Sequence, residues 1–105
     1  MTEADTPVLN TLAEINAVAL EQTKLSPASL ILVRLAALIA MDAPVISYLA
    51  HVGPAAEAGV SLDQAQDVLV AIAPIVGAPR TLSASAKIAE ALAQAVDLAE
   101  AGPGI

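Results

Sequence analysis

Cysteine, tryptophan and phenylalanine are missing from this sequence of 105 residues, and histidine and tyrosine each occur once. Without cysteine, the chain can form no disulfide, no thiolate nucleophile and no zinc or iron–sulfur site held by cysteine. A single histidine excludes a multi-histidine metal site within one subunit, and we expect no metal and no other cofactor. With Tyr48 as the only aromatic residue, the chain also lacks a platform on which nucleic-acid bases could stack.

Positive charge is also scarce, because four lysines and arginines face eleven aspartates and glutamates, for a net charge of −7. This excess repels phosphate backbones and anionic lipids, so we expect no nucleic-acid partner. No apolar run reaches the roughly 20 residues that a membrane helix needs, since Arg34 interrupts the most apolar stretch, residues 28–41. The N-terminus carries Glu3 and Asp5 instead of the basic start of a secretory signal. The sequence therefore predicts a cytoplasmic protein without a membrane span.

Apolar residues, by contrast, make up 57% of the chain, while only 14% of the residues are charged. A single domain of this length buries a modest share of its surface. A monomer would leave much apolar surface in water, so we expect copies of the chain to cover it in a homo-oligomer.

Alanine and leucine dominate the sequence, and the alternation typical of strands is rare, so we expect an all-α fold. Proline and capping signals divide residues 7–100, a single domain, into five helices. We place these helices at 7–22, 27–40, 44–58, 62–76 and 79–100. The segments 1–6 and 101–105 are expected to be flexible.

Three local signals support these boundaries. Ser26 can cap the helix that Pro27 opens, and Ser61 with Gln64 forms a capping box. The helix over 27–40 is apolar on nearly all sides, which predicts that it is the buried central helix.

The stretch from His51 to Pro79 carries the most specific pattern in the chain. It reads H-V-G-P-A-A-E-A-G-V-S-L-D-Q-A-Q-D-V-L-V-A-I-A-P-I-V-G-A-P. Together with the L-S-P opening at Leu25, it resembles the carboxymuconolactone decarboxylase and alkylhydroperoxidase D-like family as far as about Val96. The resemblance implies an alkylhydroperoxidase D-like fold, with the second to fourth helices as its core. It also implies an oligomer, commonly a trimer or hexamer.

The residues of this chain are compatible with only part of the chemistry known in that family. Its peroxidase branch uses a Cys-x-x-Cys pair ahead of the histidine and a glutamate one helix earlier. Counting back from His51, the cysteine positions hold Pro44 and Ser47, and the glutamate position holds Ile31 or Leu32. A serine hydroxyl cannot cycle through a disulfide, so we expect no thiol peroxidase activity. The decarboxylase branch, which does not depend on the pair, implies a lyase acting on a small lactone that bears carboxylates.

The candidate catalytic residues are His51, Tyr48 and Ser47, which can share one face of a helix. An imidazole can carry a proton near neutral pH, so His51 is the candidate acid/base group. Two alternatives stay open: a packed histidine bonded to a backbone carbonyl, and a metal bound by three symmetry-related copies of His51.

Arg34 and Arg80 are the candidate ligand-binding residues, since a guanidinium suits a carboxylate. Arg34 lies in the most apolar helix, where it either holds an anionic ligand or pairs with an acidic residue, Asp42 among them. Arg80 lies at the start of the last helix, where free backbone donors attract anions. Its alternative is a solvated first-turn residue.

Two functions therefore stay open. In the first, a cysteine-free decarboxylase-like protein performs acid/base chemistry, a decarboxylation or isomerisation, on a small carboxylate or lactone through His51. In the second, a non-catalytic protein binds a small ligand or supports an assembly on the same scaffold. The surroundings of His51 distinguish them, because a cavity beside a cation favours the enzyme and a filled site favours the scaffold.

Overall fold

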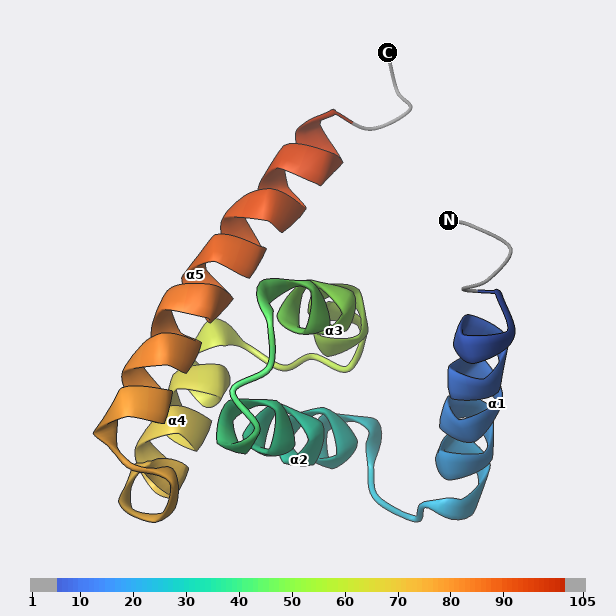
Figure 1. The fold of residues 1–105 in the computed structure, drawn as a ribbon, viewed down its shortest axis with the longest axis horizontal. Helices are drawn as coiled ribbons and strands as arrows, with labels where there is room; N and C mark the ends of the chain where they lie inside the picture. The colour runs from blue at the N-terminus through green and yellow to red at the C-terminus, as the bar shows by residue number, and fades with distance from the viewer. Residues whose placement is uncertain (1–5, 102–105) are drawn as a thin grey trace.

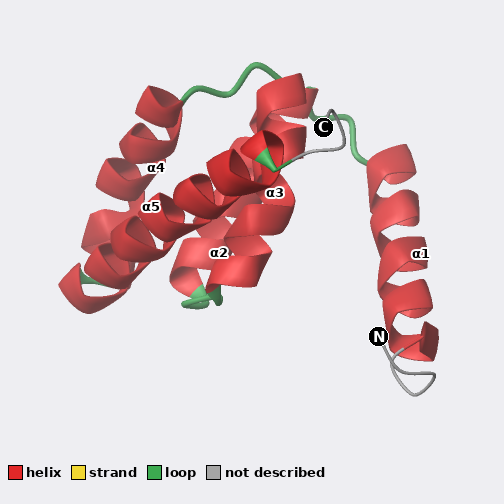
Figure 2. Cartoon of the chain, turned by 90° about the horizontal axis from the view of Figure 1, so that it is seen from above, coloured by secondary structure: helices red, strands yellow, loops and turns green. Residues whose placement is uncertain are grey.

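The computed structural model describes residues 6–101, and in this range the chain contains five helices and no strand (Figures 1 and 2). The helices are α1 (Thr6–Gln22), α2 (Pro27–Ala40), α3 (Val45–Glu57), α4 (Leu62–Val76) and α5 (Ala78–Glu100). The predicted all-α fold is confirmed. Thr6, expected to be flexible, instead begins α1, while the rest of the predicted flexible ends lies outside the described residues apart from Ala101, a turn residue.

Both predicted helix caps are present. The side chain of Ser26 accepts a hydrogen bond of 3.2 Å from the backbone N–H of Ser29, with Pro27 at the start of α2. At α4, Ser61 Oγ accepts from the N–H of Gln64 at 3.1 Å, and Gln64 Oε1 accepts from the N–H of Ser61 at 2.9 Å. These bonds satisfy backbone donors that a helix start leaves unpaired.

The helices α2 to α5 form the body of the molecule. α3 packs along α5, and α2 contacts α3, α4 and α5. Each of these helices contributes to one buried cluster, which consists of Ile39, Tyr48, Leu69, Ala84 and Ala91. The two alanines lie seven residues apart on α5, on one face, where their small side chains let α5 approach its neighbours closely.

The prediction that the helix over 27–40 is buried is correct for one face only. Ile31 and Ile39 of α2 are buried, whereas Val33 is 55% exposed. Because α2 carries apolar residues on nearly all sides, its sequence shows only that any of its faces could be buried. The packing of three neighbouring helices selects the side that faces the core.

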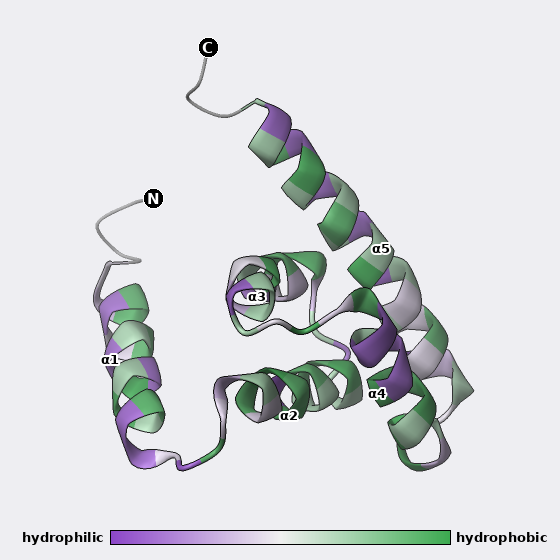
Figure 3. Ribbon diagram, turned by 180° about the vertical axis from the view of Figure 1, so that it is seen from behind, coloured by the Kyte–Doolittle hydropathy of each residue, from purple (hydrophilic) through white to green (hydrophobic). Residues whose placement is uncertain are grey.

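α1 lies apart from this body (Figure 1), and within residues 6–101 it packs against none of the other helices. No residue of α1 is buried, and its apolar stripe is open to solvent, with Val8 60%, Leu12 55% and Ile15 60% exposed. The alternation of apolar and polar residues along α1 is visible in Figure 3. A hydrogen bond of 2.7 Å from Arg34 Nη1 to Asn16 Oδ1 connects α1 to α2.

The dimensions of the chain reflect this separate helix. Its radius of gyration is 14.9 Å, against about 13 Å for a compact domain of this length. Its accessible surface is 7118 Å², against roughly 5,400 Å² for a compact monomer of this mass. Across residues 6–101, no helix is long and apolar enough to cross a bilayer.

Candidate functional site

A cavity of about 210 Å³, partly open to solvent, lies between α2, α3, α4 and α5. Its walls are mainly aliphatic, with Ile31 and Leu35 from α2 and Ile88 and Leu92 from α5 among them. The polar side chains among the lining residues are those of Tyr48, His51 and Ser61. The cavity therefore offers a ligand a largely apolar surface with a few polar groups, as small-molecule sites do.

Tyr48 lies on α3, and only 4% of its surface is exposed. Its hydroxyl oxygen is buried and has no hydrogen-bond partner within the described part of the chain. Burial raises the pKa of the Tyr48 phenol, and the negative charge of Asp42 raises it further. The side chain therefore stays protonated at neutral pH, and its hydroxyl is covered by protein atoms although the residue lines the cavity.

His51 follows one turn later on α3 and is half-buried. Its Nδ1 lies 2.7 Å from the backbone carbonyl oxygen of Ser47. Because a carbonyl only accepts hydrogen bonds, the geometry assigns the proton of the neutral ring to Nδ1. Nε2 then carries the lone pair and is the ring nitrogen that can accept a proton from a ligand.

The structure thus brings together two of the three predicted catalytic side chains. Tyr48 and His51 both line the cavity, while Ser47 is not among the lining residues and contributes its carbonyl to the orientation of His51. The hydrogen bond to this carbonyl is also the contact expected for the alternative in which His51 is a packed residue.

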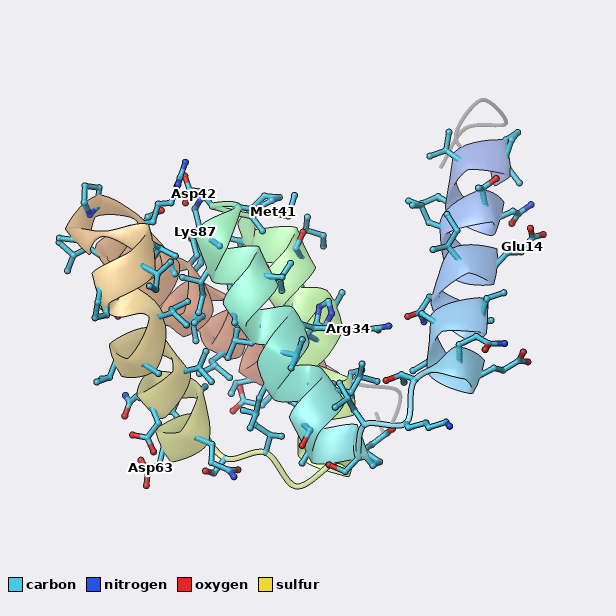
Figure 4. The ribbon with its side chains drawn as sticks, turned by 90° about the horizontal axis from the view of Figure 1, so that it is seen from below. Glu14, Arg34, Met41, Asp42, Asp63 and Lys87 are labelled. Carbon is cyan, nitrogen blue, oxygen red and sulfur yellow. The ribbon has the colours of Figure 1, made fainter. Side chains whose placement is uncertain are left out.

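Neither predicted ligand-binding arginine lines the cavity. Arg34 extends from α2 toward α1 (Figure 4), where it donates to Asn16. Arg80 is exposed in the first turn of α5. Within residues 6–101, no lysine or arginine is among the lining residues of the cavity.

Within residues 6–101, Arg34 forms no ion pair with an acidic residue. Its hydrogen-bond partner is the uncharged Asn16, and Asp42 instead pairs with Lys87, with 3.0 Å between Oδ1 and Nζ (Figure 4). Arg34 and Asn16 are brought together by the placement of α1, which the pattern of charges does not indicate.

Asp42 occupies the turn between α2 and α3, with a left-handed φ of 53°. Its Oδ1 accepts hydrogen bonds from Ser83 Oγ at 2.7 Å and from Lys87 Nζ at 3.0 Å, and both partners lie on α5. These bonds hold the pKa of the Asp42 carboxyl below its usual range. The carboxylate of Asp42 therefore connects the α2–α3 turn to α5.

The sequence interpretation missed most of the cavity. Ser61, predicted as a cap, also lines the cavity, and aliphatic residues of α2 and α5 form much of its wall. No sequence signal marks these residues, because the cavity depends on how four helices pack. In the described range, no group of three or more histidine, aspartate or glutamate side chains gathers to hold a metal ion.

Comparisons with known proteins agree with the fold. No curated protein and no solved structure matches the chain significantly. The sequence model described as Carboxymuconolactone decarboxylase family matches residues 6–91. This match begins well before Leu25, where the resemblance was expected to start, so it includes α1, and it ends within α5. The chain therefore belongs to the carboxymuconolactone decarboxylase family.

Proposed function

We propose that this chain performs acid/base chemistry, a decarboxylation or an isomerisation, on a small lactone or carboxylate bound in the cavity. The observation that carries the proposal is the orientation of His51. Because Nδ1 donates to the Ser47 carbonyl, Nε2 is the basic nitrogen of a histidine that lines the cavity. A base in this position can remove a proton next to a carbonyl group and return it at another carbon.

The neighbouring groups suit such a proton transfer. The Ser47 carbonyl accepts from Nδ1 both before and after Nε2 takes up a proton, so the ring keeps its orientation during the transfer. The hydroxyl of Tyr48 is covered by protein atoms, and once the side chain moves to expose it to the ligand, it can donate to the oxygen on which negative charge develops. The roles assigned are therefore His51 as the proton carrier, Tyr48 as the donor, and Ser47 as the residue that orients His51 through its backbone.

Thiol peroxidase activity is not part of this proposal. The chain has no cysteine, and Pro44 and Ser47 stand at the positions of the redox pair. Peroxide reduction in the peroxidase branch requires a thiolate and a resolving thiol. A lyase or isomerase reaction needs neither.

We further infer that the protein works as a homo-oligomer, for which the family suggests a trimer or hexamer. The support is the exposed stripe of α1 and a surface about 1,700 Å² larger than that of a compact monomer. This excess is about twice the roughly 800 Å² that each partner buries in a standard interface. A second copy of the chain can supply the partner that α1 lacks in its own body.

A non-catalytic ligand-binding or assembly protein is the second candidate. The observation that favours it is that no cation lines the cavity within the described residues, so a carboxylate would find no counter-charge there. In this alternative, the hydrogen bond between His51 and Ser47 serves packing alone.

The experiment that separates the two candidates uses α-angelica lactone, a small neutral lactone whose double bond can move into conjugation. The wild-type protein should accelerate this isomerisation, which ultraviolet absorbance follows, and should incorporate deuterium from heavy water into the product. His51→Gln keeps the size of the side chain but removes the base, so the rate above background should fall by about 100-fold or more. Binding without isomerisation would support the non-catalytic alternative.

A further inference from the structure

The open apolar stripe of α1 has a counterpart on α2. We propose that α1 of one copy packs against the outer face of α2 in a second copy, where the outer face is the side of α2 that carries Leu30, Val33, Ala37 and Met41. The inference rests on the homo-oligomer proposed above, and it names the surface that receives α1. Each copy then gives one α1 and receives one, an arrangement that closes in a twofold pair or in a ring.

The outer face of α2 is apolar and uncovered. Val33 is 55% exposed, and Met41, at the C-cap of the helix, is 78% exposed. The opposite side of α2 carries the buried Ile39 and the cavity-lining Leu35. None of the four outer-face residues lines the cavity, so a helix packed on this face would leave the candidate site in place.

The two surfaces match in length and spacing. The stripe of α1 consists of four apolar residues at the i, i+4, i+7 and i+11 positions of one helix face, Val8, Leu12, Ile15 and Ala19. On α2, Leu30 and Met41 are the same number of positions apart, so each surface runs for about 16 Å along its helix. Two helices with apolar surfaces of equal length can pack side by side over that whole length.

The charges of the helices favour α2 over the rest of the body. α1 carries Glu14 and Glu21, both on the side away from the stripe, and no positive charge. α2 carries Arg34 and no acidic residue, whereas acidic side chains outnumber basic ones on each of α3, α4 and α5. Like charges brought together in an interface disfavour association, so α2 is the body helix whose charge suits α1.

α1 of the same copy does not cover the outer face. Arg34 extends from α2 toward α1 (Figure 4), and its Nη1 donates to Asn16 Oδ1 at 2.7 Å. Within residues 6–101, α1 nevertheless makes no packing contact with α2. Asn16 lies beside the stripe and not within it, so this hydrogen bond leaves the stripe open. The two helices of one copy are connected by a polar contact and leave both apolar surfaces to another chain.

The accessible area is consistent with two contacts for each copy. The surface of the chain exceeds that of a compact monomer by about 1,700 Å². A standard interface buries roughly 800 Å² on each partner. Giving one α1 and receiving another uses two separate surfaces of each copy. Two contacts of standard size would therefore cover an area close to the excess, whereas one would cover about half of it.

The first test places the same charge on two exposed faces of the full chain. Val33→Glu puts a carboxylate on the outer face of α2, where packing would remove it from water, so the dissociation constant of the oligomer should rise about tenfold or more. Val70→Glu makes the same change on α4, where Val70 is 74% exposed, and should leave the constant unchanged. Sedimentation equilibrium measures the constant, and circular dichroism reports the helix content of both variants. Equal effects of the two substitutions, or an effect of Val70→Glu alone, would overturn the proposal.

A second test uses cross-linking and adds no charge. The native chain has no cysteine, so a thiol reagent reacts at the introduced position alone. Chains with Ile15→Cys are mixed with tagged chains that carry Ala37→Cys, left to exchange subunits, and treated with a short bismaleimide. A cross-linked species that contains one chain of each kind is expected. Tagged chains with Val70→Cys are the control and should give no such species. No mixed species with Ala37→Cys, or as much with Val70→Cys, would contradict the proposal.

The possible failures can be told apart. A wild-type mass of 10.5 kDa in sedimentation would refute both the homo-oligomer and this inference. An oligomer that Val33→Glu does not weaken would refute the assignment of α2 and leave the homo-oligomer standing. The acid/base reaction is tested separately, by the isomerisation of α-angelica lactone.

Discussion

α1 and the body of α2 to α5 are made of similar alanine- and leucine-rich sequence, yet they differ in what their apolar residues contact. Ile39 in the body has no exposed surface, whereas Ile15 in α1 is 60% exposed. The short turns of the body fold each helix back on the previous ones, while residues 23–26 leave α1 to one side (Figure 1). An amphipathic pattern thus specifies a face to be covered and does not specify what covers it.

The comparison also locates the apolar excess. The composition predicts too much apolar surface for a monomer, and the sequence places it mainly in the helix over 27–40. In the structure, that helix has buried positions on one face, and α1 is the helix with none. Most helices in proteins gain their stability from the packing of an amphipathic face, so the proposed partner would stabilise α1, a helix of 17 residues.

The largest effect is expected from charges on the stripe of α1. The double variant Leu12→Glu, Ile15→Glu should convert the oligomer to a monomer, because two carboxylates would have to be desolvated in the interface. Circular dichroism should show that the body stays helical. Light scattering combined with size-exclusion chromatography measures the mass.

The matched control is Ala17→Glu, which adds a carboxylate on the opposite side of α1. Ala17 is exposed, and a charge there should leave the oligomer intact. A wild-type protein of 10.5 kDa in solution would contradict the interface proposed for α1.

The next largest effect is expected on the free energy of unfolding when isoleucine is replaced by alanine, once in the body and once in α1. Ile39→Ala should lower the free energy of unfolding by about 2–5 kcal/mol, because it leaves a cavity in the core. Ile15→Ala should act mainly through assembly, so its effect in urea unfolding should change when the protein is diluted tenfold. The effect of Ile39→Ala should persist on dilution. An effect of Ile15→Ala that does not depend on concentration would mean that α1 packs within its own chain.

Local sequence signals were sufficient to predict where the helices lie. They were insufficient to predict which side chains of different helices contact each other. Ser26 and Ser61 could be identified as caps because a cap bonds to a residue three positions away. The bond from Ser83 to Asp42 spans 41 positions, and the bond from Arg34 to Asn16 spans 18. Such pairs depend on the direction in which a helix leaves its turn, which a single sequence does not encode locally.

The candidate site shows the same difference between features that follow from local sequence and features that depend on long-range packing. The shared face of Tyr48 and His51 follows from helical spacing, and both residues line the cavity. Whether an arginine reaches that cavity depends on the placement of α1 and on the first turn of α5. The sequence therefore identified the polar residues on one helix but left open the charge of the ligand.

A smaller effect is expected at the caps of two body helices, which should be alike although one of them lies next to the connection with α1. Ser61→Ala, within the body, should lower the free energy of unfolding by about 1 kcal/mol, since it removes one side of the capping box. Ser26→Ala, next to the connection with α1, should cost about the same, because it breaks the same kind of bond. Chemical denaturation measures both. Clearly unequal losses would show that a cap also holds a tertiary contact.

The smallest effect concerns the pH dependence of stability. It compares two polar contacts: the hydrogen bond between Arg34 and Asn16, which connects α1 to α2, and the contacts of Asp42 with α5 within the body. Asp42 has a pKa lowered below 3.8 by its hydrogen bonds to Ser83 and Lys87, so its ionised form favours the folded state. The contribution is fully present above the ordinary pKa of the carboxyl and is lost as pH falls through the lowered value. Asn16, which links α1 to Arg34, has no titratable side chain.

Asp42→Asn is the variant that isolates this contribution, because asparagine also tolerates the left-handed backbone at this turn. Its melting temperature should lie slightly below that of wild type at about pH 7, and the two should converge as pH falls below the ordinary pKa of the carboxyl and through the lowered one. The difference in melting temperature between Asn16→Ala and wild type should not narrow in this way as pH falls. The hydrogen bond that this variant removes involves no carboxylate that could be protonated. A gap for Asp42→Asn that widens on acidification would reverse the sign of this linkage. It would show that the carboxylate does not hold the α2–α3 turn against α5.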